Sequence, residues 1–368
     1  MKTINSLNCY FALIFLLSVS FLSSAHAGVI GCNANPEKKT KILFLSNRPG
    51  GKQRKNWDLY ETDIASRQTT RLTDIPGTSI RWFDKDPTRQ RVVIAASTRG
   101  NLAIGPSGKD GGPADAEEII AILERGNKTP NILVDLRPNG FNPKKFTSVW
   151  HPTFSPDGQR IVFSASKQRE SNNLWIMNQD GSQLRRIFAE PNRTQNDPRF
   201  APNGKIAYIR HDKKGLQQLS NRDLFDVWLI DPDNPRDNQR LSNEPRIPGV
   251  SLTEFDPAIS PDCRHVAMIR AAEPIGLKSL WRPFSANAIM STNGQASGFR
   301  LMQSGLNPGR SHGVPTWIDN ETILSYRRER KVKGWRIIVY NITDDDRDVT
   351  VLNLGAPYGH SDLSPIAY

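Results

Sequence analysis

The chain has 368 residues, of which 37% are apolar, 23% charged and 8% aromatic. This apolar content is enough for a hydrophobic core and excludes wholesale disorder. Glycine and proline number 26 each, which argues against long helices and favours many short strands joined by turns. Three cysteines are too few for a disulfide-dense scaffold or a cysteine-ligated zinc module. The formal net charge is +12.

Residues 1–27 have the pattern of a secretory signal peptide. Lys2 provides the positive start, residues 11–22 are mainly apolar, and Ala25 and Ala27 fit a small-residue cleavage site. The apolar stretch is too short to anchor the protein in a bilayer, and no later stretch is long enough to span one, so we expect no transmembrane helix. We expect export to the periplasm, with an N-terminal segment at 28–40 and one domain at 41–368.

Cys32 has three interpretations. The stretch from Val29 to Cys32 resembles a lipobox, which would make the protein a membrane-anchored lipoprotein acylated at Cys32. A disulfide with Cys263 is a second option, because an oxidising compartment permits it. The sequence favours a third option, cleavage after Ala27 and a plain thiol at Cys32, because the apolar stretch ends near Leu22.

The first strands after this segment form only part of a repeat unit. We expect strands at 42–47, 58–63 and 69–73, which correspond to the second, third and fourth strands of a four-stranded unit. A weaker complete unit begins at Ser79 and continues through 91–97, 117–123 and 130–136. Alternating short apolar runs separated by turn residues are typical of antiparallel hairpins.

Residues 151–188 are the clearest unit. A strand ends at Phe154, and the turn Ser155–Gly158 leads to strands at 160–166, 173–178 and 184–188. Proline presets one dihedral of such a turn and glycine accepts a positive φ. Further units follow this one, with turn Asp or Asn residues at 203, 262 and 319.

The chain ends complete the pattern. Residues 360–365 read as a first strand with almost nothing after it, and residues 42–47 lack a first strand before them. Pairing the two makes a sixth unit and removes the exposed sheet edges that an open row would have. The sequence therefore predicts an all-β, six-bladed β-propeller of four-stranded antiparallel blades, closed by the C-terminal strand, with Asp362 and Leu363 beside Leu43 and Phe44.

The turn Ser155–Gly158, its following strand and the run from Leu174 to Gly181 resemble the TolB-type propeller repeat of bacterial envelope proteins. The resemblance covers essentially all of 40–368. It implies a secreted six-bladed propeller that binds a partner through its channel mouth. The TolB α/β domain has no counterpart here, which implies a stand-alone propeller.

First strands line the channel of a propeller. Aligning the repeats on the aromatic residue before each turn brings one position of every blade to the channel mouth: His360, Ser79, His151, Asp197, Asp256 and Val314, with His312 two residues before Val314. We expect a polar binding mouth built from His151, Asp197, Asp256, His312 and His360. One alternative is a divalent metal held by His151, His312 and His360. Another is that these side chains only cap local turns.

The loops between second and third strands are basic and should lie at the same mouth. The predicted basic rim consists of Arg54, Lys55, Arg327, Arg328 and Lys331. Such a patch attracts anionic ligands or acidic proteins, although a charged face also serves solubility. Nucleic acid is not expected, because no groove-reading motif is present.

Enzyme signatures such as GxSxG, the P-loop, HExxH and CxxC are absent from the sequence. We therefore expect a monomeric, non-enzymatic binding protein without a cofactor, whose partner is an envelope protein or an anionic ligand. The alternative is a metal-dependent propeller lyase acting on an acidic polysaccharide.

Overall fold

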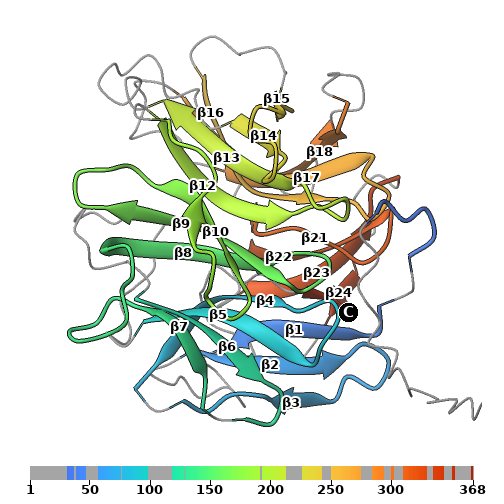
Figure 1. Cartoon of the computed structure of the whole chain (residues 1–368). Coiled ribbons are helices and arrows are strands. Elements are labelled where there is room, and N and C mark those ends of the chain that lie inside the picture. Colours follow the sequence, from blue (N-terminus) through green and yellow to red (C-terminus); the bar gives the residue numbers. More distant parts are fainter. Residues whose placement is uncertain are drawn as a thin grey trace, which may run out of the picture.

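The computed structural model describes residues 31–36, 39–46, 57–75, 77–97, 118–127, 129–190, 193–212, 226–242, 250–274, 284–293, 300–301, 310–329, 335–343, 350–352 and 366–367. These residues form six antiparallel sheets arranged as the blades of a propeller (Figure 1). None of them forms a helix that is long and apolar enough to cross a membrane.

Blades 1 to 3 have four strands each, which follow one another from the channel outward. They are β25 (Ile366–Ala367), β1 (Lys41–Ser46), β2 (Asp58–Asp63) and β3 (Thr69–Arg71) in blade 1; β4 (Ser79–Lys85), β5 (Arg91–Ser97), β6 (Ile119–Glu124) and β7 (Asn131–Asp135) in blade 2; and β8 (Phe146–Phe154), β9 (Arg160–Lys167), β10 (Asn173–Asn178) and β11 (Arg185–Arg186) in blade 3.

Blades 4 to 6 repeat the meander, and only the inner strand of blade 6 is divided. Their strands are β12 (Arg193–Phe200), β13 (Ile206–Asp212), β14 (Asp226–Ile230) and β15 (Asn238–Arg240) in blade 4; β16 (Val250–Ile259), β17 (His265–Pro274), β18 (Phe284–Ser291) and β19 (Arg300–Leu301) in blade 5; and β20 (Arg310–His312), β21 (Thr316–Trp317), β22 (Thr322–Glu329), β23 (Trp335–Asn341) and β24 (Thr350–Leu352) in blade 6.

The C-terminal strand closes the ring, as the sequence predicts. In β25, Ile366 pairs with Leu43 and Ala367 with Ile42. The closing strand lies directly after the segment 360–365 that the sequence predicted for this role. That segment, with Asp362 and Leu363, lies outside the described residues. Inner strands contact one another in turn from β4 through β8, β12, β16 and β21 to β25. Figure 1 shows blade 6, in red, beside blade 1, in blue.

Within the described part of the chain, six apolar clusters form the core, one between each pair of neighbouring blades. Each blade therefore buries both of its faces, and this explains why its middle strands are continuous apolar runs rather than alternating ones. Every residue of β5 is buried, for example. Burying apolar area on both faces of a blade is the main contribution to stability, at roughly 25 cal/mol per Å².

The turns after the inner strands are tight. Gly158 has a φ of +67°, and its N–H bonds to the carbonyl of Ser155 at 2.8 Å. A Cβ on Gly158 would lie 2.5 Å from Asp86 Oδ1 in blade 2, so this turn requires glycine for both conformation and space. At the equivalent turn of blade 5, Cys263 has a φ of +60° in the place of glycine.

A disulfide joins Cys263 to Cys32, with 5.4 Å between the Cα atoms. The plain thiol that the sequence favours is therefore wrong. The segment around Cys32 crosses three successive turns of one face: Gly31 N–H bonds to Pro202 O at 2.9 Å, and Asn33 N–H to Pro261 O at 2.7 Å. The amide of Asn320 in blade 6 donates to Ala34 O at 2.6 Å. The disulfide thus fixes the segment that leads into blade 1 onto blade 5.

Candidate binding site in the channel

One backbone hydrogen bond fixes the true alignment of the inner strands. Five residues each donate their N–H to the carbonyl at the start of the next strand, over 2.7–3.1 Å: Asp86, Ser155, Ala201, Ser260 and Ile318. The residue four places before each of them occupies the same position in its blade. These residues are Trp82, His151, Asp197, Asp256 and Val314, and we call this position the channel ring.

His151, Asp197 and Asp256 share an unusual backbone. Their φ values are +49°, +50° and +50°, and a proline follows each of them. A left-handed conformation is uncommon for residues other than glycine. At each site the register of the inner strand shifts by a β-bulge. Bulges change the direction of a side chain, and here they bring the three side chains together.

The three side chains form one polar cluster. His151 Nδ1 lies 2.7 Å from Asp197 Oδ1, and the Asp256 N–H lies 3.4 Å from Asp197 Oδ2. One ligand-type atom from each of the three residues lies within 4.8 Å of the others. About a fifth of the His151 side chain and an eighth of the Asp197 side chain are exposed, so the cluster is open to solvent.

Blade 2 differs from the prediction. The ring residue there is Trp82, which stacks on His151 with 4.1 Å between the ring centroids. The predicted residue, Ser79, is buried, and its hydroxyl accepts the Trp57 N–H at 3.2 Å. The sequence alignment is wrong at this blade because it used Trp82 as the aromatic before the turn, whereas the strand continues to Lys85. Val314 is at the ring as predicted, and it is buried.

Two charged residues that sequence reasoning missed lie two positions further along the inner strands. Asp84 of blade 2 accepts the Phe154 N–H at 2.8 Å, and burial raises the pKa of this carboxyl to about 6. Arg199 of blade 4 donates to Pro315 O of blade 6 at 2.9 Å. Counting from the turns rather than from the aromatic residues would have found both.

Arg199 extends across the channel. Its guanidinium reaches blade 6 at Pro315, and it also lies 5.8 Å from the centroid of the Trp82 ring in blade 2. Burial lowers the pKa of Arg199, while the carboxylates of Asp256, Asp84 and Asp197 oppose that shift. Three carboxylates therefore surround one guanidinium, and this part of the channel has an excess of negative charge.

A metal would find different ligands from those predicted. The imidazole and two carboxylates of His151, Asp197 and Asp256 are nitrogen and oxygen donors of the kind that divalent transition metals accept. For His312 the structure describes only the backbone, in β20, and His360 lies outside the described residues. By its register in β25, Ala367 is the counterpart of Phe154 in blade 3.

The predicted basic rim is mostly outside the described residues. Arg54, Lys55 and Lys331 are not among them, and only the backbone of Arg328 is described. Arg327 is 8% exposed, so it does not contribute a solvent-facing charge to a rim.

No family model matches this sequence, and no curated protein matches it. Solved structures do. TolB from Acinetobacter baumannii aligns over 90% of this chain and 67% of its own, at 15% identity and a TM-score of 0.58. A putative TolB from Agrobacterium tumefaciens aligns over 90% and 99%, at 12% identity and a TM-score of 0.55.

A propeller from a nidogen/laminin complex covers 88% of this chain, at 11% identity and a TM-score of 0.53. Identities this low show the fold alone. Over about nine tenths of its length, this chain is thus structurally similar to TolB β-propellers.

Proposed function

We propose that this chain is an exported, non-enzymatic binding protein whose channel receives a positively charged group of an envelope protein. The observation that carries the proposal is the carboxylate excess in the channel, where the ring residues Asp197 and Asp256 and the nearby Asp84 all interact electrostatically with Arg199. A cation placed among these carboxylates gains Coulomb energy, and the low-dielectric walls of the channel increase it.

This proposal changes the charge that we expect of the bound group from negative to positive. The sequence alone pointed to an envelope protein or an anionic ligand at a channel mouth with a basic rim. The described residues offer carboxylates inside the channel instead, with the rings of Trp82 and His151 beside them. An aromatic wall next to carboxylates suits an ammonium or guanidinium group.

Two features support export. The signal-like residues 1–27 precede the fold, and the disulfide between Cys32 and Cys263 is typical of an oxidising compartment. Acylation of Cys32 would require the sulfur that this disulfide uses. We therefore propose the periplasm, without a lipid anchor at Cys32.

Crosslinking in intact cell envelopes, followed by purification of this protein and mass spectrometry, tests the proposal. The double variant Asp197→Asn/Asp256→Asn removes two charges while keeping similar shapes. We expect the wild-type chain to capture a partner that the double variant loses, and the purified pair to dissociate more readily as salt increases. Equal capture by the variant would refute the channel as the binding site.

A metal-dependent lyase remains the second candidate, favoured by the proximity of His151, Asp197 and Asp256. Elemental analysis of the purified protein and an assay for unsaturated products from acidic polysaccharides test it. The lyase requires a stoichiometric metal and product formation that His151→Ala abolishes. A metal-free protein without cleavage would eliminate it.

A further inference from the structure

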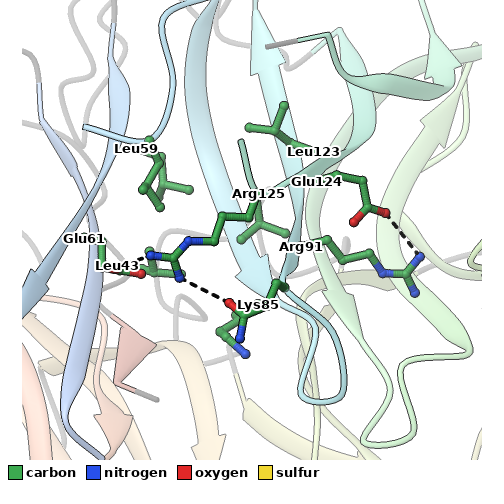
Figure 2. A pocket seen from close by; sticks show the side chains of 11 residues that line it. Leu43, Leu59, Glu61, Lys85, Arg91, Leu123, Glu124 and Arg125 are labelled. Atoms are coloured by element: carbon green, nitrogen blue, oxygen red, sulfur yellow. Dashed lines mark hydrogen bonds and ion pairs between the residues drawn. The ribbon is translucent and has the colours of Figure 1, made fainter. Parts of the chain in front are cut away.

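Long cationic side chains close the blade junctions on either side of the junction between blades 2 and 3. Between blades 1 and 2, Arg125 crosses to Glu61 at 2.8 Å, and Lys41 contacts the same carboxylate at 3.2 Å. Figure 2 shows Arg125 lying over Leu43 and Leu59 toward Glu61. The cavity that remains is about 30 Å³, the share of liquid volume that one water occupies.

The junction between blades 3 and 4 is closed in a related way. Arg185 of β11 donates to Pro232 O at 3.1 Å and to Asp233 Oδ1 at 3.2 Å. Arg160 donates to both oxygens of Asp233 at 2.8 Å. Two arginines of blade 3 thus converge on one aspartate of blade 4.

The junction between blades 2 and 3 has the same frame but lacks this closure. Asn131 of blade 2 occupies the position that Arg185 occupies in blade 3. The strand pairing shows this, because Asn131 pairs with Ile122 and Arg185 pairs with the equivalent Ile176. The short side chain of Asn131 therefore replaces an arginine. Asp180 of blade 3 corresponds to Asp233 of blade 4, because each lies shortly after the end of the third strand of its blade, at the same position in the repeat. Among the described residues no cation pairs with Asp180.

The second arginine lines this junction but makes different contacts, and its guanidinium donates to Gly158 O of blade 3 at 3.3 Å. Arg91 corresponds to Arg160, but its Nε donates to Asp86 Oδ2 at 2.6 Å, and its guanidinium also bonds to Gln179. A groove of about 410 Å³ therefore opens between the two blades. This volume lies within the range of small-molecule sites.

The lining of the groove has a definite chemistry. It consists of the buried Ile122, several side-chain amides, the carboxylates of Glu124 and Asp180, and the guanidinium of Arg91. Gln179 Nε2 donates to Gln159 Oε1 at 2.9 Å, which orders one wall. Asp180 accepts the Ser182 N–H with one oxygen at 2.9 Å. Arg91 lies 3.9 Å from a carboxylate oxygen of Glu124. Both carboxylates therefore keep oxygens that can accept further hydrogen bonds.

We propose that this groove binds a neutral saccharide. A sugar hydroxyl both donates and accepts, which matches carboxylates that only accept and amides that do both. The C–H face of a sugar ring would rest on Ile122. An anionic ligand is disfavoured, because Asp86 neutralises Arg91 whereas Glu124 and Asp180 carry the exposed charges. The site is separate from the channel ring and does not depend on its function.

Titration calorimetry of the whole disulfide-bonded protein with maltotriose, cellobiose and N,N′-diacetylchitobiose tests this inference. We expect saturable binding of at least one of them, with a dissociation constant of about 1 mM or lower. Asn131→Arg supplies the side chain that closes the next junction, so we expect it to weaken that binding at least tenfold. Gln239→Arg, which adds the same charge on the exposed outer strand β15, is the matched control and should bind normally.

Asp180→Asn is the second variant, because it removes a charge without filling space. It should also weaken binding, with a melting temperature close to that of the wild-type chain. Failure of all three sugars to bind would overturn the proposal. Binding that both Asn131→Arg and Asp180→Asn leave unchanged would overturn the location.

Discussion

The carboxyl of Asp84 is held in the channel wall by the Phe154 N–H, at 2.8 Å. Asp84 is half-buried, and desolvation is the largest influence on its carboxyl, raising the pKa from 3.8 to about 6. The folded protein therefore binds a proton at Asp84 more tightly than the unfolded chain does. This stabilising contribution is complete below pH 4 and disappears as the pH rises through about 6.

Asp84→Asn should remove this pH dependence. The asparagine oxygen still accepts the Phe154 N–H, and no proton is lost. Relative to the wild-type chain, the variant should gain stability between pH 4 and pH 7, by at most about 3 kcal/mol at 1.4 kcal/mol per pKa unit. Urea denaturation at both pH values measures the difference. A difference that stays constant with pH would contradict the role of Asp84.

The channel ring was predictable where the repeat is regular. In blades 3 to 5, a polar residue followed by proline precedes the turn at constant spacing, so His151, Asp197 and Asp256 can be recognised from the sequence. Trp82 could not, because in blade 2 the strand continues past the aromatic residue. The position of Arg199 can be found by counting from the turn, but its contact with blade 6 cannot. The side chain is long enough to cross to that blade, and spacing along one strand gives no information about that distance.

The segment 31–36 joins three blades from outside the sheets. Its one covalent contact is at Cys263, which replaces the glycine found at Gly158 and Gly204 in the equivalent turns. A cysteine at a φ of +60° is less favourable than glycine by about 1 kcal/mol. The replacement of a repeated turn glycine by cysteine is visible in the sequence, and it is the signal that distinguishes a disulfide from a plain thiol in this chain.

Removing the disulfide should destabilise the fold. Cys32→Ser should cost about 2–4 kcal/mol, because the unfolded chain loses a cross-link between distant residues. Adding Cys263→Gly to this variant should restore about 1 kcal/mol, since glycine adopts the left-handed turn without strain. Urea denaturation of the three proteins without reductant provides the comparison. Equal stability of Cys32→Ser and the wild-type chain would show that the disulfide does not stabilise the fold.

At the scale of the whole molecule, the repeat made the architecture predictable. Each unit alone leaves two apolar faces exposed, so six of them must stack, and closing the stack removes both free edges. The position of the closing strand was harder to predict. Residues 360–365 resemble an inner strand by composition, but the described pairing involves Ile366 and Ala367. A two-residue strand carries too little pattern for its register to be read from the sequence.

Besides the apolar cluster between blades 6 and 1, two links hold the seam of the ring. The strand β25 connects the end of blade 6 to β1, and the disulfide connects blade 5 to the segment that enters β1. Losing either one leaves the other to hold blade 1 in place. Deleting residues 366–368 should therefore lower the melting temperature moderately, while deleting only Tyr368 serves as the control.

The deletion should cost more when Cys32→Ser is also present. With both links absent, β1 becomes a free inner edge and the ring can open, so the combined loss should exceed the sum of the separate losses by about 0.5–3 kcal/mol. Calorimetric unfolding of the four proteins at several concentrations measures this coupling. Association of the doubly altered chain would accompany it, because an open edge pairs with other chains. Strictly additive losses would mean that the disulfide and β25 stabilise the molecule independently and do not share the seam.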